Sequence, residues 1–280
     1  MATTLEHFWT TDELWHVPAG WRQGRGAWGG IVAGQVITAA TAAVHANLGV
    51  EFPVRSAHIA MLGAVPTGDV FVSCLMLRAG SATAAVEVTL RAEGELLTRA
   101  TVVFGKPRQP TPVSTVIESE VVIPDPATAA FVPLGPPISP EFTSNLRFAP
   151  VAGFPYSQSN PMAASGWISL PATATDRPTA AMLAALVDGW WTAALTGFGP
   201  EVMETGLPPL ATLDFLATFP SSEAEIEQSL GAHPWQVGLY HQGQVLAGTQ
   251  GYLTEVSSLH APDGRLLVSN TQVVAVGRGL

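Results

Sequence analysis

The chain has 280 residues, of which 47% are apolar and 12% are charged, and its formal net charge is −10. This composition excludes an intrinsically disordered chain, and the negative charge argues against nucleic acid or an anionic membrane as the main partner. The single cysteine, Cys74, excludes internal disulfides and fits a reducing compartment. Because Cys74 lies in an apolar, strand-like run, we expect it to be a core residue.

The N-terminus carries acidic residues and no basic region of the kind that begins a secretory signal. No uninterrupted apolar run is long enough to cross a bilayer. We therefore expect a cytoplasmic protein without a membrane partner.

The first 28 residues are rich in aromatic side chains but lack clear periodicity, and we expect an arm that packs on the core. Gly24, Gly26 and Gly29 fit the G-x-G-x-x-G spacing of dinucleotide-binding proteins. That motif needs a buried strand just before the glycines and repeated β-α-β units, and neither is visible here. We interpret the glycines as a turn that opens a helix.

A helix is predicted over residues 30–44, where the side chains are apolar nearly all round. Four segments rich in Val, Leu, Phe and Thr follow and predict strands. They are 53–62, 69–78, 82–92 and 95–104. An apolar helix followed by an antiparallel meander is the order expected for a sheet that curls around a central helix.

A proline-rich stretch over residues 106–140 indicates an extended connection, within which 114–123 is a possible strand. It suggests three parts of the chain. They are an N-terminal unit 1–106, a linker 107–150 and a C-terminal unit 151–280.

The stretch 180–199 has apolar residues at three- and four-residue spacing, which predicts a buried helix as far as Leu195. Asp188 lies on its apolar face. A buried carboxylate without partners is strongly disfavoured, so Asp188 needs partners or a function. Alternatively, Asp188-Gly189 breaks the helix into two short pieces, and Asp188 caps the second.

The order of elements in the second half repeats that of the first. Strands are predicted at 166–170, 210–219, 235–241, 245–260 and 265–276, with a hairpin at 261–264. Residues 94–103 (GELLTRATVV) align without gaps with residues 264–273 (GRLLVSNTQV), and each consists of a hairpin turn and a final strand. We infer a twofold internal repeat.

Polar groups collect in the second copy of this repeat. Asp188 stands where the first copy has neutral Gln35, and Gln272 stands where it has Val102. Thr212 lies on the strand after the second helix. Thr212 or Gln272 alone is more simply read as a solvent-facing strand residue, but the three elements can converge in a sheet wrapped around a helix.

The same alignment places Ser56 opposite Thr212 and His58 opposite Asp214. A structural histidine with a satisfied ring is the simpler interpretation of His58. The seven histidines show no close pairing of metal ligands, so we expect no metal and no other cofactor.

At these residues the chain resembles the type II acyl-CoA thioesterases, which have two fused hotdog folds. The resemblance includes Gly29-Gly30, the aspartate of the second helix, the strand 211–214 and the pair Thr271-Gln272. It implies an α+β double hotdog, in which each of two tandem repeats is an antiparallel sheet wrapped around a central helix.

The resemblance also implies an activity, the hydrolysis of acyl-CoA to a free acid and CoA. In that family an Asp, a Thr or Ser, and a Gln orient the attacking water, which implies these roles for Asp188, Thr212 and Gln272. The chain departs from the family pattern after two of these residues. Phe215-Leu216 stand where the family often has His-Ser, and Val273-Val274 where it often has Glu-Gly, which indicates a divergent branch.

Other functions stay open at this point. One is a non-catalytic acyl-CoA-binding or scaffold protein. Another is a hotdog dehydratase, which would want a His or an Asp/His pair in the helix region, and the second helix has no His. A thioesterase of the α/β-hydrolase type would need a G-x-S-x-G nucleophile elbow, and the sequence has none.

Positive charge is uneven, because nine of the 12 Arg and Lys residues lie within residues 1–150. We therefore expect the CoA phosphates to meet the first half or the linker. The candidate substrate-binding residues are Gly29, Gly30, Arg22, Arg25, Arg99, Lys106 and Arg108. We expect acyl-CoA as the partner and at least a homodimer, since edge strands of fused hotdogs usually pair with another copy.

Overall fold

The computed structural model describes residues 5–108, 121–206 and 208–277. In the first half the strands are β1 (Leu14–Val17), β2 (Arg22–Gln23), β3 (Gly26–Ala27), β4 (Val54–Met61), β5 (Gly68–Ala79), β6 (Thr83–Ala92) and β7 (Glu95–Gly105). In the second half they are β8 (Arg147–Ala152), β9 (Ala163–Ser169), β10 (Leu210–Thr218), β11 (Leu239–Thr249), β12 (Tyr252–His260) and β13 (Leu266–Val276).

The α-helices are α1 (Gly29–Leu48), α2 (Ala180–Val187), α3 (Val202–Thr205), α4 (Glu223–Leu230) and α5 (Pro234–Val237). Short 3-10 helices are η1 (Leu5–Phe8), η2 (Pro126–Thr128), η3 (Glu141–Asn145) and η4 (Ala193–Gly197).

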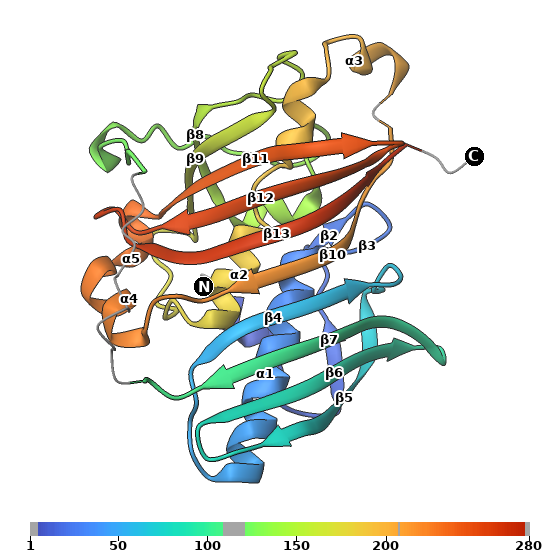
Figure 1. The fold of residues 1–280 in the computed structure, drawn as a ribbon. Coiled ribbons are helices and arrows are strands. Elements are labelled where there is room, and N and C mark those ends of the chain that lie inside the picture. Colours follow the sequence, from blue (N-terminus) through green and yellow to red (C-terminus); the bar gives the residue numbers. More distant parts are fainter. Residues whose placement is uncertain (1–4, 109–120, 207, 278–280) are drawn as a thin grey trace.

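Eleven strands form one antiparallel sheet in the order β1-β5-β6-β7-β4-β10-β13-β12-β11-β9-β8. The two halves of the chain join where β4 pairs with β10, in the middle of the view in Figure 1. Helix α1 packs on the strands of the first half, α2 packs on β12 and β13, and the two helices contact each other. This arrangement confirms the predicted α+β double hotdog.

Helix α1 forms because its residues are apolar on nearly every side, and Ile31, Val32 and Val36 are almost fully buried. Its 20 residues also meet the length and mean hydropathy of a membrane span, although polar residues such as Gln35 interrupt the apolar run. In this fold the helix packs against the sheet and α2. Length and composition do not distinguish such a core helix from a membrane helix.

Helix α2 is shorter than predicted and ends at Val187, with Asp188 at its C-cap. Gly189 follows, and it lies so close to the core that a Cβ there would meet Ile168 Cδ1 at 2.6 Å. The alternative prediction, that the helix breaks at Asp188-Gly189, is therefore confirmed. Thr192, however, caps the second piece, η4, by accepting a hydrogen bond from the N–H of Ala194.

The N-terminal arm packs on the core as predicted. Strand β1 extends the sheet beside β5, and the glycine-rich segment forms the β2–β3 hairpin that leads into α1. Trp21 stacks on Trp28, and Trp28 stacks on Phe142, with ring centroids 5.7 and 4.5 Å apart. These rings join the arm to the segment that connects the two halves.

Several local predictions were wrong. Residues 235–237 are helical, and the predicted strand 245–260 is instead parts of two strands that turn at Gln250-Gly251, where both φ angles are positive. Helix α4 was missed, although Ser222 and Glu225 form a capping box. The possible strand 114–123 lies mostly outside the described residues.

Cys74 was expected in the core, but it is exposed. It pairs with Val88 across β5 and β6, beyond the part of β5 that β1 covers. An apolar run on a strand that its neighbour covers only in part therefore does not guarantee burial.

Strand register corrects the repeat alignment by two residues around Thr212. In the second half, Thr212 lies opposite Val274 on β13. In the first half, Val54 lies opposite Phe104 on β7. Because residue 104 aligns with 274, the counterpart of Thr212 is Val54 and not Ser56. A bulge follows each of the two residues, which supports this correspondence.

Gly30 allows the close approach of the two central helices. A Cβ at this position would lie 2.2 Å from Trp28 Cζ2 and 2.6 Å from the backbone oxygen of Ala185. We predict that Gly30→Ala lowers the free energy of unfolding by about 1–3 kcal/mol, measured by urea denaturation, because the backbone must move. Gly63→Ala is the matched control and costs less than about 0.5 kcal/mol, since its Cβ would meet only the end of the Leu97 side chain. Equal losses in both variants would contradict this explanation.

Candidate active site

Asp188 lies where the end of α2 meets the beginning of α1. A Cβ on Gly29 would be 2.8 Å from Asp188 Oδ2, so the carboxylate occupies the space that a side chain would fill. The indole N–H of Trp28 donates to the backbone oxygen of Asp188 at 3.1 Å. The predicted pair Gly29-Gly30 therefore lies directly against the predicted aspartate.

The surroundings of Asp188 favour its neutral form. Burial, and to a smaller extent the nearby charge of Glu255, raises the pKa of this carboxyl from 3.8 to about 7. The backbone N–H of Gly30 and the side chain of Trp28 oppose this rise. A carboxyl with a pKa near neutrality can accept and return a proton at physiological pH, which is the property required of a general base.

Thr212 and Gln272 are brought together by a β-bulge. Beyond the bulge Phe215 lies opposite Gln272, and before it Thr212 lies opposite Val274. Opposite residues share a face, so the bulge turns Thr212 to the inner face that Gln272 also occupies. The Thr212 hydroxyl donates to Gln272 Oε1 at 3.3 Å. Regular alternation from Phe215 would have pointed Thr212 outward.

Glu255 on β12 was missed by the sequence analysis. It is 2% exposed, and its carboxylate accepts hydrogen bonds from the Thr192 hydroxyl and from Gln272 Nε2, the latter at 3.4 Å. Burial raises its pKa, and these donors oppose the rise. Since Glu255 also acts on Asp188, it links the aspartate to the Thr212–Gln272 pair. Its position opposite Gln272 would have identified it, but that position is known only when the register of β12 and β13 is known.

His58 Nε2 and Asp214 Oδ1 are hydrogen-bonded at 2.6 Å. Both side chains are about half exposed, and Asp214 lies on the other side of the bulge from Thr212. The pair bridges β4 and β10 on the outer face of the sheet. The ring of His58 is therefore paired, as the structural interpretation expects.

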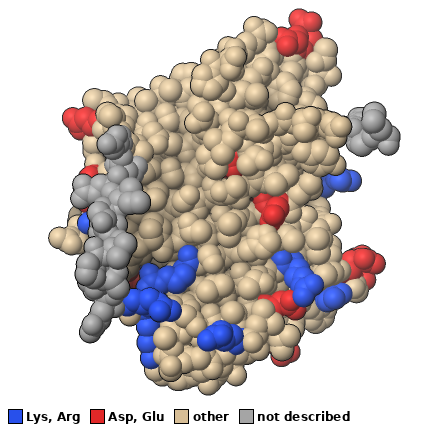
Figure 2. Space-filling view, viewed as in Figure 1, with Lys and Arg blue, Asp and Glu red and all other residues tan. Residues whose placement is uncertain are grey.

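The predicted phosphate-binding cations do not gather in one place. Arg25 is exposed on the β2–β3 hairpin, four residues before Gly29. Arg99 is paired with Glu87 at 2.8 Å on the outer face. Lys106 and Arg108 line a groove together with Arg55, near the start of β4. Thr212 lies beyond the other end of β4. Most of the Lys and Arg side chains visible in Figure 2 lie over the first half.

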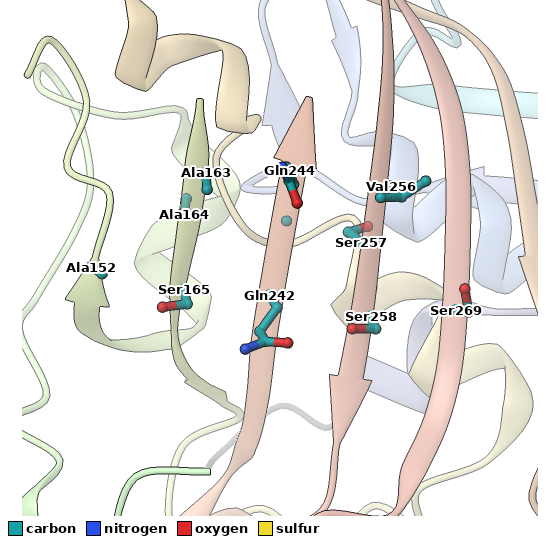
Figure 3. Close-up of a pocket in the computed structure, with 11 residues that line it drawn as sticks. Ala152, Ala163, Ala164, Ser165, Gln242, Gln244, Val256, Ser257, Ser258 and Ser269 are labelled. Carbon is teal, nitrogen blue, oxygen red and sulfur yellow. The ribbon is translucent and has the colours of Figure 1, made fainter. Parts of the chain in front are cut away.

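A hollow of about 380 Å³ on the outer face of β9, β11, β12 and β13 is separate from these residues (Figure 3). Its lining mixes small apolar residues with polar ones, among them Ser165, Gln242 and Ser258 across neighbouring strands. Asp188, Thr212 and Gln272 are not among the lining residues. Within the described residues, no three His, Cys, Asp or Glu side chains are grouped as metal ligands.

Several solved structures share this fold. A hot dog fold protein from Alicyclobacillus acidocaldarius has a TM-score of 0.78 at 19% identity, covering 95% of this chain and 93% of that one. A putative thioesterase II from Thermobifida fusca has a TM-score of 0.76 at 15% identity, covering 99% and 98%. An acyl-CoA thioesterase II from Mycobacterium marinum has a TM-score of 0.66 at 16% identity, covering 95% and 93%.

The sequence matches no curated protein. Family comparisons match both halves: residues 17–105 match the acyl-CoA thioesterase N-terminal domain, and residues 119–276 match the acyl-CoA thioesterase C-terminal domain. Together they span nearly the whole of the described fold, including all the residues of the candidate site. The chain belongs to the acyl-CoA thioesterase family.

Proposed function

We propose that the protein hydrolyses acyl-CoA to a free carboxylic acid and CoA, with Asp188 as the general base. The observation that carries this proposal is the desolvated carboxyl of Asp188, whose pKa of about 7 suits proton transfer near neutrality. Membership of the acyl-CoA thioesterase family supports the same reaction.

In this mechanism a water molecule is bound between Asp188 and the hydrogen-bonded pair of Thr212 and Gln272. Asp188 takes a proton from the water as its oxygen attacks the thioester carbonyl carbon. The carbonyl oxygen becomes an oxyanion, for which the N–H of Gly29 at the start of α1 is a candidate donor. The tetrahedral intermediate then breaks its C–S bond, and the departing CoA sulfur receives the proton from Asp188.

Of the proposed phosphate-binding residues, Arg25 lies nearest in the sequence to Gly29, against which the Asp188 carboxylate lies. The hairpin that carries it packs on the loop after β4, where the N–H of Ala27 donates to the backbone oxygen of Val65. Lys106 and Arg108 lie at the far end of β4 and form the alternative phosphate site. The division of the chain at residues 106 and 150, a cytoplasmic location and a homodimer or larger assembly stay predictions.

We predict that Asp188→Asn lowers kcat by roughly 10²- to 10⁴-fold, since an amide cannot take the proton from water. Thiol release from acyl-CoAs of several chain lengths measures this loss. In the unmutated protein, kcat/KM should rise with pH through about 7, as Asp188 loses its proton. Asp214→Asn is the matched control and keeps full activity, because its carboxylate pairs with His58 on the outer face. Binding of acyl-CoA without thiol release would instead favour a non-catalytic acyl-CoA-binding protein.

The same substitution should stabilise the fold at high pH. The pKa of Asp188 is higher in the folded chain than in the unfolded one, so the wild-type protein loses stability as pH rises from about 4 to about 7. Asparagine has no such loss. We therefore expect Asp188→Asn to raise Tm by roughly 2–5 °C at about pH 8, and by little at about pH 4. An equal Tm difference at both pH values would show that the effect is not electrostatic.

The two candidate phosphate sites can be separated with a truncated substrate. We predict that Arg25→Ala raises KM for acyl-CoA about three- to tenfold and leaves KM for the corresponding acyl-pantetheine unchanged, because the latter lacks the nucleotide phosphates. The double variant Lys106→Ala/Arg108→Ala should leave both KM values unchanged. If the double variant raises KM for acyl-CoA and Arg25→Ala does not, the nucleotide phosphates bind in the groove beside Arg55 instead.

A further inference from the structure

Glu255 is a buried carboxylate for which the proposed hydrolysis has no role so far. It lies on the inner face of β12, 2% exposed, and one of its oxygens, Oε2, accepts from the Thr192 hydroxyl. The backbone N–H groups of Ala193 and Ala194 also donate to this carboxylate. Its other oxygen, Oε1, accepts from Gln272 Nε2. Such a group is costly to bury, so these donors must offset a large loss of hydration.

The first half of the molecule shows that the sheet does not need this carboxylate. Glu255 lies opposite Gln272 on β12 and β13, and Val86 lies opposite Val102 on β6 and β7. Both valines are fully buried. The hotdog repeat is therefore complete with an apolar pair at this position. In the second half, both members of the pair are polar, and both lie on the inner face of the sheet.

An ionised carboxylate can only accept hydrogen bonds, so the atom of Gln272 that faces Glu255 must be the amide nitrogen. The amide oxygen then points to the other side, where Thr212 donates to it. We propose that Glu255 is a positioning residue that fixes the carboxamide of Gln272 with its oxygen toward Thr212 and the attacking water. This role rests on the proposed hydrolysis.

Two titratable groups face Glu255 from neighbouring elements. Asp188 lies at the end of α2, and the charge of Glu255 raises its pKa. His241 lies on β11, where its Cε1 and Glu255 Oε1 would be 3.2 and 3.7 Å from a Cβ placed on Gly243. Burial lowers the pKa of His241 to about 3, so this ring is neutral and does not compensate the carboxylate near neutral pH.

The test is Glu255→Gln, which keeps the shape and removes the charge. The new amide keeps its oxygen toward Thr192, Ala193 and Ala194, and turns its NH₂ group toward Gln272. Two donors then meet, and Gln272 must reverse, which places its own NH₂ beside Thr212. We expect kcat to fall roughly 10- to 100-fold while KM changes less than about threefold. The rise of kcat/KM with pH should also move to lower pH, since a negative charge near Asp188 is lost.

Repeating the substitution in a Gln272→Ala variant distinguishes positioning from general structural support. In Gln272→Ala there is no amide to orient, so adding Glu255→Gln should lower kcat by less than about threefold further. Glu255→Val, which introduces the residue found at the counterpart position 86, should lose kcat like Glu255→Gln and provides a folded variant if the amide is not tolerated. Ser257→Ala, on the same face of β12, is the matched control and should keep kcat within about twofold.

The proposal is overturned if Glu255→Gln keeps wild-type kcat, or if it loses as much activity in the Gln272→Ala background as in the wild type. Failure of the proposed hydrolysis looks different. In that case the unmutated protein releases no thiol, or Asp188→Asn is as active as the wild type.

Discussion

The structure depends on the contact between the end of α2 and the beginning of α1. There the Asp188 carboxylate occupies the space left by the missing side chain of Gly29. The contact fixes the helix pair under the sheet, and it also removes water from the carboxyl, which raises its pKa to about 7. Burial of this carboxyl thus lowers the stability of the fold at the point where proton transfer is needed, which is common at functional sites.

The two halves share a fold but differ in what lies between helix and sheet. In the first half, valines fill the facing inward positions 86 and 102. Gln35, which the sequence alignment places opposite Asp188, exchanges two hydrogen bonds with the backbone of Thr10 in the N-terminal arm. In the second half, Glu255, Gln272 and Thr212 form a hydrogen-bonded chain beside Asp188. One half therefore serves as a scaffold, while the other carries the polar residues of the candidate site.

The order of elements in the sequence predicted a sheet curled around a central helix, occurring twice, and the resemblance to the type II thioesterases implied the double hotdog. The sequence also identified Asp188, as a charge within an apolar helix. It failed where a single residue changes the geometry: Gly189 ends α2 early, and the bulge after Thr212 changes which residue aligns with it. Glu255 escaped notice because its alternating strand gives no sign of which face is inward until the pairing with β13 is known.

The central claim is that the fold raises the pKa of the Asp188 carboxyl to about 7. It is tested most directly by recording the carbon-13 resonance of the Asp188 carboxyl against pH, assigned by comparison with Asp188→Asn. The account predicts a midpoint at about 7, well above the ordinary aspartate value of 3.8. A midpoint near that ordinary value would show that the carboxyl is hydrated in solution, and it would contradict the account.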